Sequence, residues 1–276
     1  MSRRIDRDAL MEFVRKRRKT TGGYGATPRL PATIQDTFQA VAISLVLGQP
    51  PPRLQTDPAL LGYLTRMQAV PWLGIGSIFR LLLICRICGL SLDSGLVRTR
   101  IVACLGNDTS LAATYYGRRI LAEMLDERSF AGAERAAVLP ARFAVDDVAR
   151  YLFVQKMEER PIEGAEQLTG WLQQAQNGDG GFGFFPGTTS FIENSHAALA
   201  ALTLLGTRPQ EPDKALAFIL SCQTGGGGFA RSHGAAPFLD ASWHGAASLA
   251  LLAGMGLPAG AAPDTLRLDR RLLLSL

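Results

Sequence analysis

The chain contains three copies of one sequence pattern, and this internal repetition limits its fold more than any other feature. Residues 22–48, GGYGATPRLPATIQDTFQAVAISLVLG, align without a gap with residues 180–206, GGFGFFPGTTSFIENSHAALAALTLLG. A third copy follows 47 residues after the second and places Phe229 on Phe182 and Ser242 on Ser195. Each copy consists of a Gly-Gly-aromatic turn, a polar loop and an apolar helix that ends at a glycine.

Fainter copies fill the interval between the first two strong ones. Their equivalent positions, taken together with those of the strong copies, are residues 36, 77, 113, 147, 194 and 241. Six helical hairpins then account for the whole chain, and a hairpin can bury its apolar stripe only by stacking on its neighbours. The sequence therefore predicts an all-α fold, an (α/α)6 toroid of helical hairpin repeats with a central apolar cavity. An open HEAT-like solenoid has a similar period and is the alternative.

Local signals mark the ends of the helices that follow the turns. Thr33 with Asp36, and Ser190 with Glu193, have the spacing of capping boxes, in which a hydroxyl and a carboxylate satisfy free amides of the first turn. Ala- and Leu-rich runs follow, which favour helix. Each run ends at a glycine, which accepts the left-handed conformation that commonly terminates a helix.

Charge is concentrated at the beginning of the chain. The net charge is +5, and residues 1–19 carry all of it, because basic and acidic residues balance in the remainder. We treat residues 1–276 as a single domain with a basic N-terminal segment, residues 1–19. The run from Arg15 to Lys19 has the composition of a solvated helix end, with contact to phosphate, RNA or an acidic membrane as the alternative. The balanced remainder argues against a nucleic-acid-binding protein.

Neither the cysteines nor the apolar runs indicate a secreted or membrane protein. Cys85 and Cys88 form a C-x-x-C in an apolar run, but no second close pair completes a zinc ribbon, so buried free thiols are expected. No signal peptide opens the chain, and Arg80 and Arg86 interrupt the longest apolar stretch, so no transmembrane segment is predicted. A cytoplasmic location is the expectation.

The segments TTGGYGATPRLPATIQDTFQA, QNGDGGFGFFPG and SCQTGGGGFARSHGAAPFLDASWHGAASLALLAG resemble the repeats of protein prenyltransferase β subunits and class II terpenoid cyclases. The resemblance is specific in the three strong repeats and weak between residues 50 and 150. It implies a ring of inner helices around a cavity that accepts an isoprenyl diphosphate or another long apolar ligand. It also implies that a partner subunit could complete the protein, as the helical α subunit does in protein prenyltransferases.

The two enzyme classes require different residues, and the transferase set is incomplete here. Protein prenyltransferases hold zinc with an Asp, a Cys two residues later and a His. Those first two positions fall on Phe191 and Glu193 in one repeat and on Phe238 and Asp240 in the next, so the standard zinc triad is not found. The carboxylates of Glu193 and Asp240 remain candidate ligands, together with two histidines, for a divalent metal such as zinc or magnesium. Capping of helices by the two acids is the alternative.

Class II cyclases protonate an alkene or epoxide with the middle Asp of a D-x-D-D motif. Residues 144–147, Ala-Val-Asp-Asp, resemble that motif with its first Asp replaced. Asp146 would be the acid and Asp147 its partner. The alternative is that both carboxylates only meet the positive end of a helix. The ordinary aromatic content, 8%, argues against a cavity that stabilises successive carbocations.

Six further residues are predicted to contact the ligand. They combine acidic, basic, imidazole and aromatic side chains, and they are Asp36, Tyr115, Arg118, His196, Trp243 and His244. Three functions remain open: a prenyltransferase-like enzyme without the standard zinc triad, a class II cyclase-like enzyme that uses Asp146, and a non-catalytic isoprenoid-binding or scaffold subunit.

Overall fold

A computed structural model describes residues 4–48, 51–71, 73–125, 137–257 and 270–275. Within these residues the elements that form are helical, and a five-residue π-helix, η1, continues α7. Their bounds are α1 Arg7–Arg15, α2 Ile34–Val46, α3 Pro51–Gln55, α4 Pro58–Gln68, α5 Ile75–Ile87, α6 Ser94–Asn107, α7 Leu111–Arg119, η1 Ile120–Met124, α8 Val145–Met157, α9 Ala165–Gln174, α10 Ile192–Leu205, α11 Pro212–Ser221, α12 Leu239–Gly254 and α13 Arg270–Leu273.

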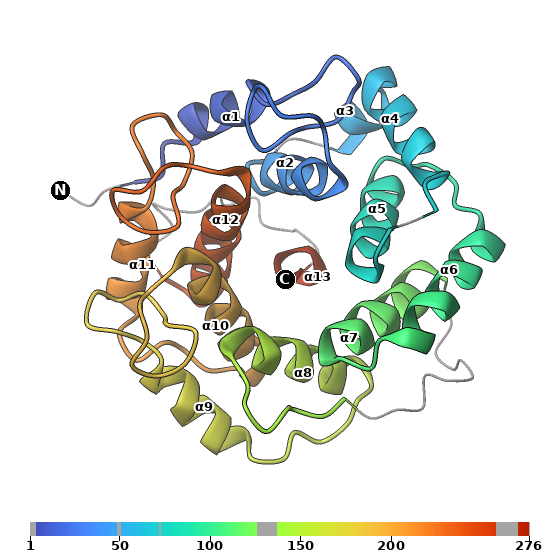
Figure 1. Cartoon of the computed structure of the whole chain (residues 1–276). Helices are drawn as coiled ribbons and strands as arrows, with labels where there is room; N and C mark the ends of the chain where they lie inside the picture. Colours follow the sequence, from blue (N-terminus) through green and yellow to red (C-terminus); the bar gives the residue numbers. More distant parts are fainter. Residues whose placement is uncertain (1–3, 49–50, 72, 126–136, 258–269, 276) are drawn as a thin grey trace.

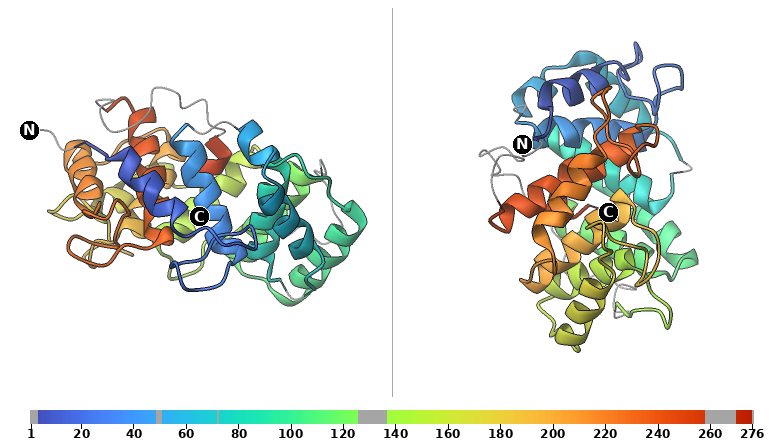
Figure 2. Two further views of the ribbon diagram at one scale, coloured as in Figure 1. Left: turned by 90° about the horizontal axis from the view of Figure 1, so that it is seen from above. Right: turned by 90° about the vertical axis from the view of Figure 1, so that its left-hand side faces the viewer.

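The helices form two concentric layers (Figure 1). The inner layer follows the order α2, α5, α7, α8, α10 and α12, and each of these helices packs against the next one. The contact between α12 and α2 closes the circle. Outside them lie α1, α4, α6, α9 and α11, and the views in Figure 2 show how the layers overlap. The predicted closed toroid is therefore confirmed, and the open solenoid is wrong.

The six repeat positions that the sequence assigned all fall at the same place in the inner layer. Residues 36, 77, 113, 147, 194 and 241 are each the third residue of an inner helix. The faint copies in the middle of the chain are thus real structural repeats. Their turns have diverged, but their inner helices keep the spacing that the ring requires.

In the strong copies, one hydroxyl ties the aromatic turn to its inner helix. The backbone N–H of Phe182 donates to Ser195 Oγ at 3.0 Å, and that hydroxyl donates to the carbonyl oxygen of Phe191 at 2.9 Å. Ser242 does the same for the Phe229 turn, at 2.9 and 2.7 Å. Without these serines the backbone N–H groups of Phe182 and Phe229 would be buried without a partner, which costs about 1–3 kcal/mol for each group. This bond explains why a serine recurs at the positions of Ser195 and Ser242.

Each strong turn also packs against the outer helix of the next hairpin, and this contact requires glycine. Gly227 has φ +90°, and a Cβ placed there would lie 2.1 Å from the carbonyl oxygen of Ala9 in α1. Gly180 meets Lys214 of α11 in the same way, at 2.1 Å. A side chain is excluded both by the backbone conformation and by the neighbouring carbonyl.

The third turn closes the ring onto the beginning of the chain. Gln223 accepts from the backbone N–H of Asp6 at 2.9 Å and donates to the carbonyl oxygen of Asp6 at 2.8 Å. Gln176 makes the same pair with Glu211 within the ring, at 2.9 and 3.0 Å. Helix α1, although first in the chain, is thus the outer helix that the last turn needs.

Part of the basic N-terminal segment belongs to this closure, whereas Arg15 and Lys16 are solvent-exposed, as expected for a helix end. Leu10, Phe13 and Val14 of α1 are buried. The Arg17 guanidinium lies 3.3 Å from the Phe13 ring centroid and donates to the Phe13 carbonyl oxygen at 2.8 Å. Lys19 donates to two loop carbonyls at 2.7 and 2.8 Å. Several of the basic side chains are therefore used inside the fold.

The predicted helix ends are partly confirmed. Thr33 caps α2 as expected, because its hydroxyl oxygen accepts from the Asp36 N–H at 3.0 Å. Gly206 ends α10 with φ +71°. The expected cap at Ser190 is wrong: α10 begins after Phe191, and the Ser190 hydroxyl donates to Asp179 at 2.8 Å within the turn.

Replacement of Gly227 by alanine tests the closure contact. We expect Gly227→Ala to lower the free energy of unfolding by at least about 3 kcal/mol, because the new methyl group meets backbone and not a mobile side chain. Gly225→Ala is the matched control, since a Cβ there meets nothing within 4 Å. Equal denaturation midpoints for the two variants would contradict this role of Gly227.

Candidate ligand-binding site

A cavity of about 350 Å³ lies where the N-terminal halves of several inner helices meet. Its walls come from α2, α5, α8, α10 and α12, from the turns before α10 and α12, and from residues 270–275, which we call the C-terminal segment. The lining residues are Gln35, Phe38, Arg80, Asp146, Arg150, Phe184, Glu193, Asn194, Ala197, Arg231, Asp240, Trp243, His244 and Ser275. This volume is at the lower end of the range for small-molecule sites.

The cavity is more polar than the sequence predicted. Arg150 pairs with Asp146 at 2.6 Å, and Arg231 pairs with Glu193. Asp240 accepts from Gln39 Nε2 at 2.5 Å. The reason is the helix direction: the wall is built from helix N-termini, which favour acidic residues in the first turn, and the arginines then balance those acids. The lining of this part of the ring therefore combines charged side chains with the apolar ones that were predicted.

One side of the cavity is aromatic. Trp243 on α12 packs edge-on against Phe38 on α2, with ring centroids 5.7 Å apart. Ala197 of α10 lies in the same lining, and Phe184 is half exposed at its edge. Trp243 is the predicted ligand contact that the structure places most clearly on an apolar wall.

The C-terminal segment occupies the middle of the ring. Helix α13 lies at the centre in Figure 1, and Leu272, Leu273 and Leu274 are buried there. Tyr115 of α7 donates its hydroxyl proton to the carbonyl oxygen of Leu274 at 2.7 Å. Tyr115 is fully buried by this contact. It therefore holds the chain's own backbone, and the prediction that it contacts a ligand is not supported by its position.

Arg119 forms a buried polar network that the sequence did not predict. Its side chain is fully buried, forms two hydrogen bonds with Glu123 at 2.9 and 3.2 Å, and donates to Tyr115 at 2.6 Å and to Ser275 at 3.1 Å. Its guanidinium also lies 4.5 Å from the Phe79 ring centroid. The spacing of Arg119 and Glu123, four residues apart on one helix, was the available signal.

His196 and His244 form a pair between α10 and α12. Their Nδ1 atoms are 2.8 Å apart, and His196 Nε2 lies 2.7 Å from the carbonyl oxygen of Leu273. Burial lowers the pKa of His196 to about 3, with a contribution from His244. Burial, followed by the charge of Arg80, lowers the pKa of His244 to about 4. Of the two, only His244 lines the cavity.

The remaining predicted site residues divide between the cavity and the scaffold. Arg118 pairs with Glu158 at 2.9 Å. Asp36 accepts from the Thr33 hydroxyl at 2.6 Å, and burial raises its pKa. Both therefore act as parts of the scaffold. Asp146 borders the cavity, whereas Asp147 accepts from the backbone N–H at the start of α8 at 3.0 Å, which is a capping bond.

The expected metal ligands do not assemble. Among the described residues, no three His, Cys, Asp or Glu side chains lie close enough together to hold a metal ion. Glu193 is engaged by Arg231, and both ring nitrogens of His196 already have partners. The residues at the zinc positions of protein prenyltransferases therefore do not form a three-ligand metal site in the described part of the chain, and the metal role of Glu193 and Asp240 stays a prediction.

Two other features carry no evident chemistry. The four cysteines are free, and burial raises the pKa of Cys85 to about 12 and that of Cys88 to about 11, so these thiols are unreactive.

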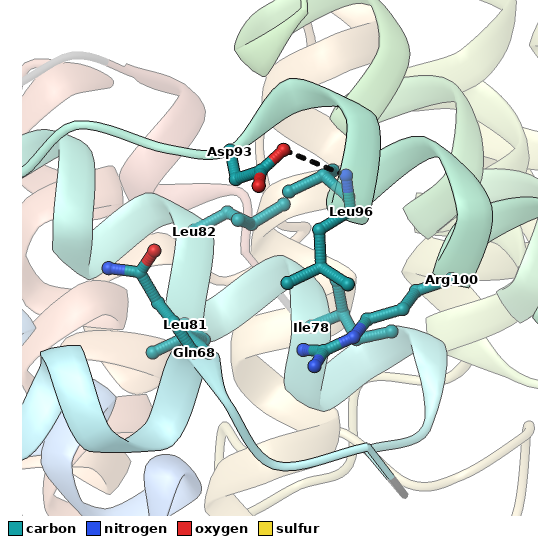
Figure 3. Close-up of a pocket in the computed structure, with 8 residues that line it drawn as sticks. Gln68, Ile78, Leu81, Leu82, Asp93, Leu96 and Arg100 are labelled. Carbon is teal, nitrogen blue, oxygen red and sulfur yellow. Dashed lines mark hydrogen bonds between the residues drawn. The ribbon is translucent and has the colours of Figure 1, made fainter.

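A second cavity, of about 20 Å³, lies between α4, α5 and α6 (Figure 3). Mostly apolar side chains line it, and it has room for about one water molecule.

The closed double ring and its internal cavity define a helical α/α toroid. The chain belongs to the prenyltransferase alpha-alpha toroid domain family, whose sequence model matches residues 1–77, 113–252 and 210–272. Comparison with curated proteins finds no match. In the part of the chain that the structure describes, no helix has the length and apolar character needed to cross a membrane.

Removal of one hydroxyl tests the anchoring of the C-terminal segment. We expect Tyr115→Phe to lower the free energy of unfolding by about 2 kcal/mol, because it deprives the Leu274 carbonyl and Arg119 of a buried partner. Tyr151→Phe on α8 is the control, since that hydroxyl is outside this network. If denaturant titration gives the two variants equal stability, the anchoring role is contradicted.

The histidine pair predicts the direction of the pH dependence of stability. The folded-state pKa values, about 3 and about 4, lie below the ordinary value of 6.5. The unfolded chain therefore binds more protons between pH 6.5 and about 4, and stability falls as pH drops through that window. We expect a loss of at least about 3 kcal/mol, much reduced in His196→Phe and unchanged in His233→Gln. A flat profile in the unmodified protein would contradict the neutral pair.

Proposed function

We propose that the cavity binds an isoprenyl diphosphate and that the protein transfers its prenyl group without the standard zinc triad. The observation that carries the proposal is the combination, in one cavity, of an aromatic wall and three arginines. The wall contains Phe38 and Trp243, and the arginines are Arg80, Arg150 and Arg231. An isoprenyl diphosphate has the matching two-part character, an apolar chain and an anionic head.

The apolar chain would lie against the aromatic side. Trp243 and Phe38 present ring faces and edges, and Ala197 leaves space beside them. Burial of apolar surface contributes about 25 cal/mol for each Å² removed from water. Carbon chains of moderate length therefore gain several kcal/mol in such a site, and the modest volume favours the shorter prenyl groups.

The diphosphate would lie at the arginine side. Arginine suits this group because its planar fork donates two parallel hydrogen bonds to oxyanions. The N-terminal ends of α8, α10 and α12 also favour anions there. Arg150 and Arg231 are paired with Asp146 and Glu193. When a diphosphate binds, its oxygens would replace those carboxylate oxygens as partners of the two arginines. Arg150, whose side chain is largely buried, would therefore keep an anionic partner.

The cyclase alternative has less support. The carboxylate that would have to act as its acid, Asp146, is already paired with Arg150 at 2.6 Å. The binding-only alternative has one specific observation in its favour. The C-terminal segment occupies the ring centre, so the volume left for a substrate is small.

Thermal unfolding with and without farnesyl diphosphate tests the binding proposal. A ligand at 100 times its dissociation constant stabilises the folded state by about 2.7 kcal/mol, which raises the Tm of a domain of this size by roughly 5 °C or more. We expect Arg231→Gln to weaken binding about tenfold, since a charge-assisted contact is lost. Arg29→Gln, in an exposed loop, is the control.

Two outcomes count against the proposal. No rise in Tm at millimolar farnesyl diphosphate excludes binding of this ligand class. Equal affinity for farnesyl diphosphate in the Arg231→Gln and Arg29→Gln variants would show that the cavity arginines do not hold the head group. Release of diphosphate from the bound ligand, measured with a thiol or alcohol present, separates transfer from binding alone.

A further inference from the structure

The histidine pair has a proton arrangement that the structure determines. A carbonyl oxygen can only accept, so the 2.7 Å contact with Leu273 requires a proton on His196 Nε2. The two Nδ1 atoms, 2.8 Å apart, need one proton between them. Burial keeps His196 neutral, so its single proton is already on Nε2. His196 Nδ1 is then the acceptor, and His244 carries its proton on Nδ1.

Among the residues that the structure describes, no donor bonds the other ring nitrogen of His244, so the lone pair of Nε2 is unused there. The atom belongs to a residue that lines the cavity, and its side chain is 14% exposed. Asp240 Oδ1 lies 3.8 Å from it, but a carboxylate oxygen has no proton to donate. Arg80 acts on the same ring by its charge. A ligand in the cavity that carries an O–H or S–H group would supply the missing donor.

We propose that Nε2 of His244 is the base that accepts the proton of a hydroxyl or thiol substrate in the cavity, and that His196 is the positioning residue that holds it in this tautomer. The inference rests on the proposed prenyl transfer. It names the second substrate of that reaction, a neutral protic nucleophile. The order of contacts is Leu273 carbonyl, His196, His244, then the substrate.

The step balances as follows. The substrate oxygen or sulfur forms a bond to C1 of the prenyl group, and the bond between C1 and the diphosphate oxygen breaks with its electron pair on the diphosphate. The substrate proton moves to His244 Nε2. The imidazolium that results lies next to the Asp240 carboxylate, 3.8 Å away, and near the departing anion, and both stabilise its charge. The low pKa of the resting ring therefore rises when the negatively charged ligand is present.

Nitrogen NMR of the full-length protein tests the tautomers without any ligand. The chain has three histidines, so a two-bond ¹H–¹⁵N spectrum of histidine-labelled protein contains three ring patterns, and His233→Gln assigns one of them. At pH 7 we expect His244 protonated on Nδ1 and His196 protonated on Nε2. In His196→Phe, His244 loses its acceptor and is expected to change to the Nε2-protonated form. A His244 ring protonated on Nε2 in the unmodified protein would overturn the proposal.

A chemical test measures whether the lone pair is accessible. Diethyl pyrocarbonate acylates unprotonated imidazole nitrogens, and peptide mass spectrometry locates the product. We expect His244 to be modified, His196 to be spared, and His196→Phe to slow modification of His244 at least tenfold. Protection of His244 by farnesyl diphosphate would add support, whereas modification of His196 in preference to His244 would overturn the arrangement.

A transfer assay separates this inference from the function on which it rests. With farnesyl diphosphate and 2-mercaptoethanol as the probe nucleophile, we expect His244→Phe to reduce thioether formation about 100-fold or more, and His233→Gln to leave it unchanged. Undiminished thioether formation in His244→Phe refutes the base and leaves prenyl transfer standing. Absence of thioether from a protein with the expected tautomers refutes prenyl transfer and leaves the assignment of the lone pair standing.

Discussion

The whole architecture depends on the contact between a glycine turn and the outer helix of the next hairpin. In that contact Gly227 approaches the carbonyl oxygen of Ala9 more closely than any side chain would permit, and Gln223 satisfies both backbone groups of Asp6. The same contact within the ring uses Gln176. Because each hairpin fixes the direction of the next, repeats of similar length curve steadily and meet their own beginning.

Closure determines the chemistry of the interior. A closed ring brings the N-terminal halves of α2, α8, α10 and α12 to one cavity. Acidic side chains are favourable at helix N-termini, and arginine side chains pair with those acids. The remaining central space is filled by the C-terminal segment, whose carbonyls are held by Tyr115 and His196. The segment thus has two effects: it restricts the cavity, and through His196 it sets the proton position on His244.

The sequence predicted the repeated parts of the molecule well and the unique parts poorly. The six equivalent positions were assigned by comparing the copies with one another, and in the structure each is the third residue of an inner helix. The bonds of Tyr115 and Arg119 to the C-terminal segment could not be predicted, since they join residues about 160 positions apart that belong to no repeat. Glu193 and Asp240 were candidate metal ligands or helix caps, and their contacts with Arg231 and Gln39 join separate repeats, so the sequence did not predict them.

Native-state hydrogen exchange at the Asp6 amide tests ring closure most directly. This N–H donates to Gln223 across the closure, and the Glu211 amide makes the equivalent bond to Gln176 within the ring. The account predicts comparable protection at both amides, and loss of protection at Asp6 alone in a Gln223→Ala variant. An Asp6 amide that exchanges as fast as an unstructured peptide, beside a protected Glu211, would contradict the closed ring.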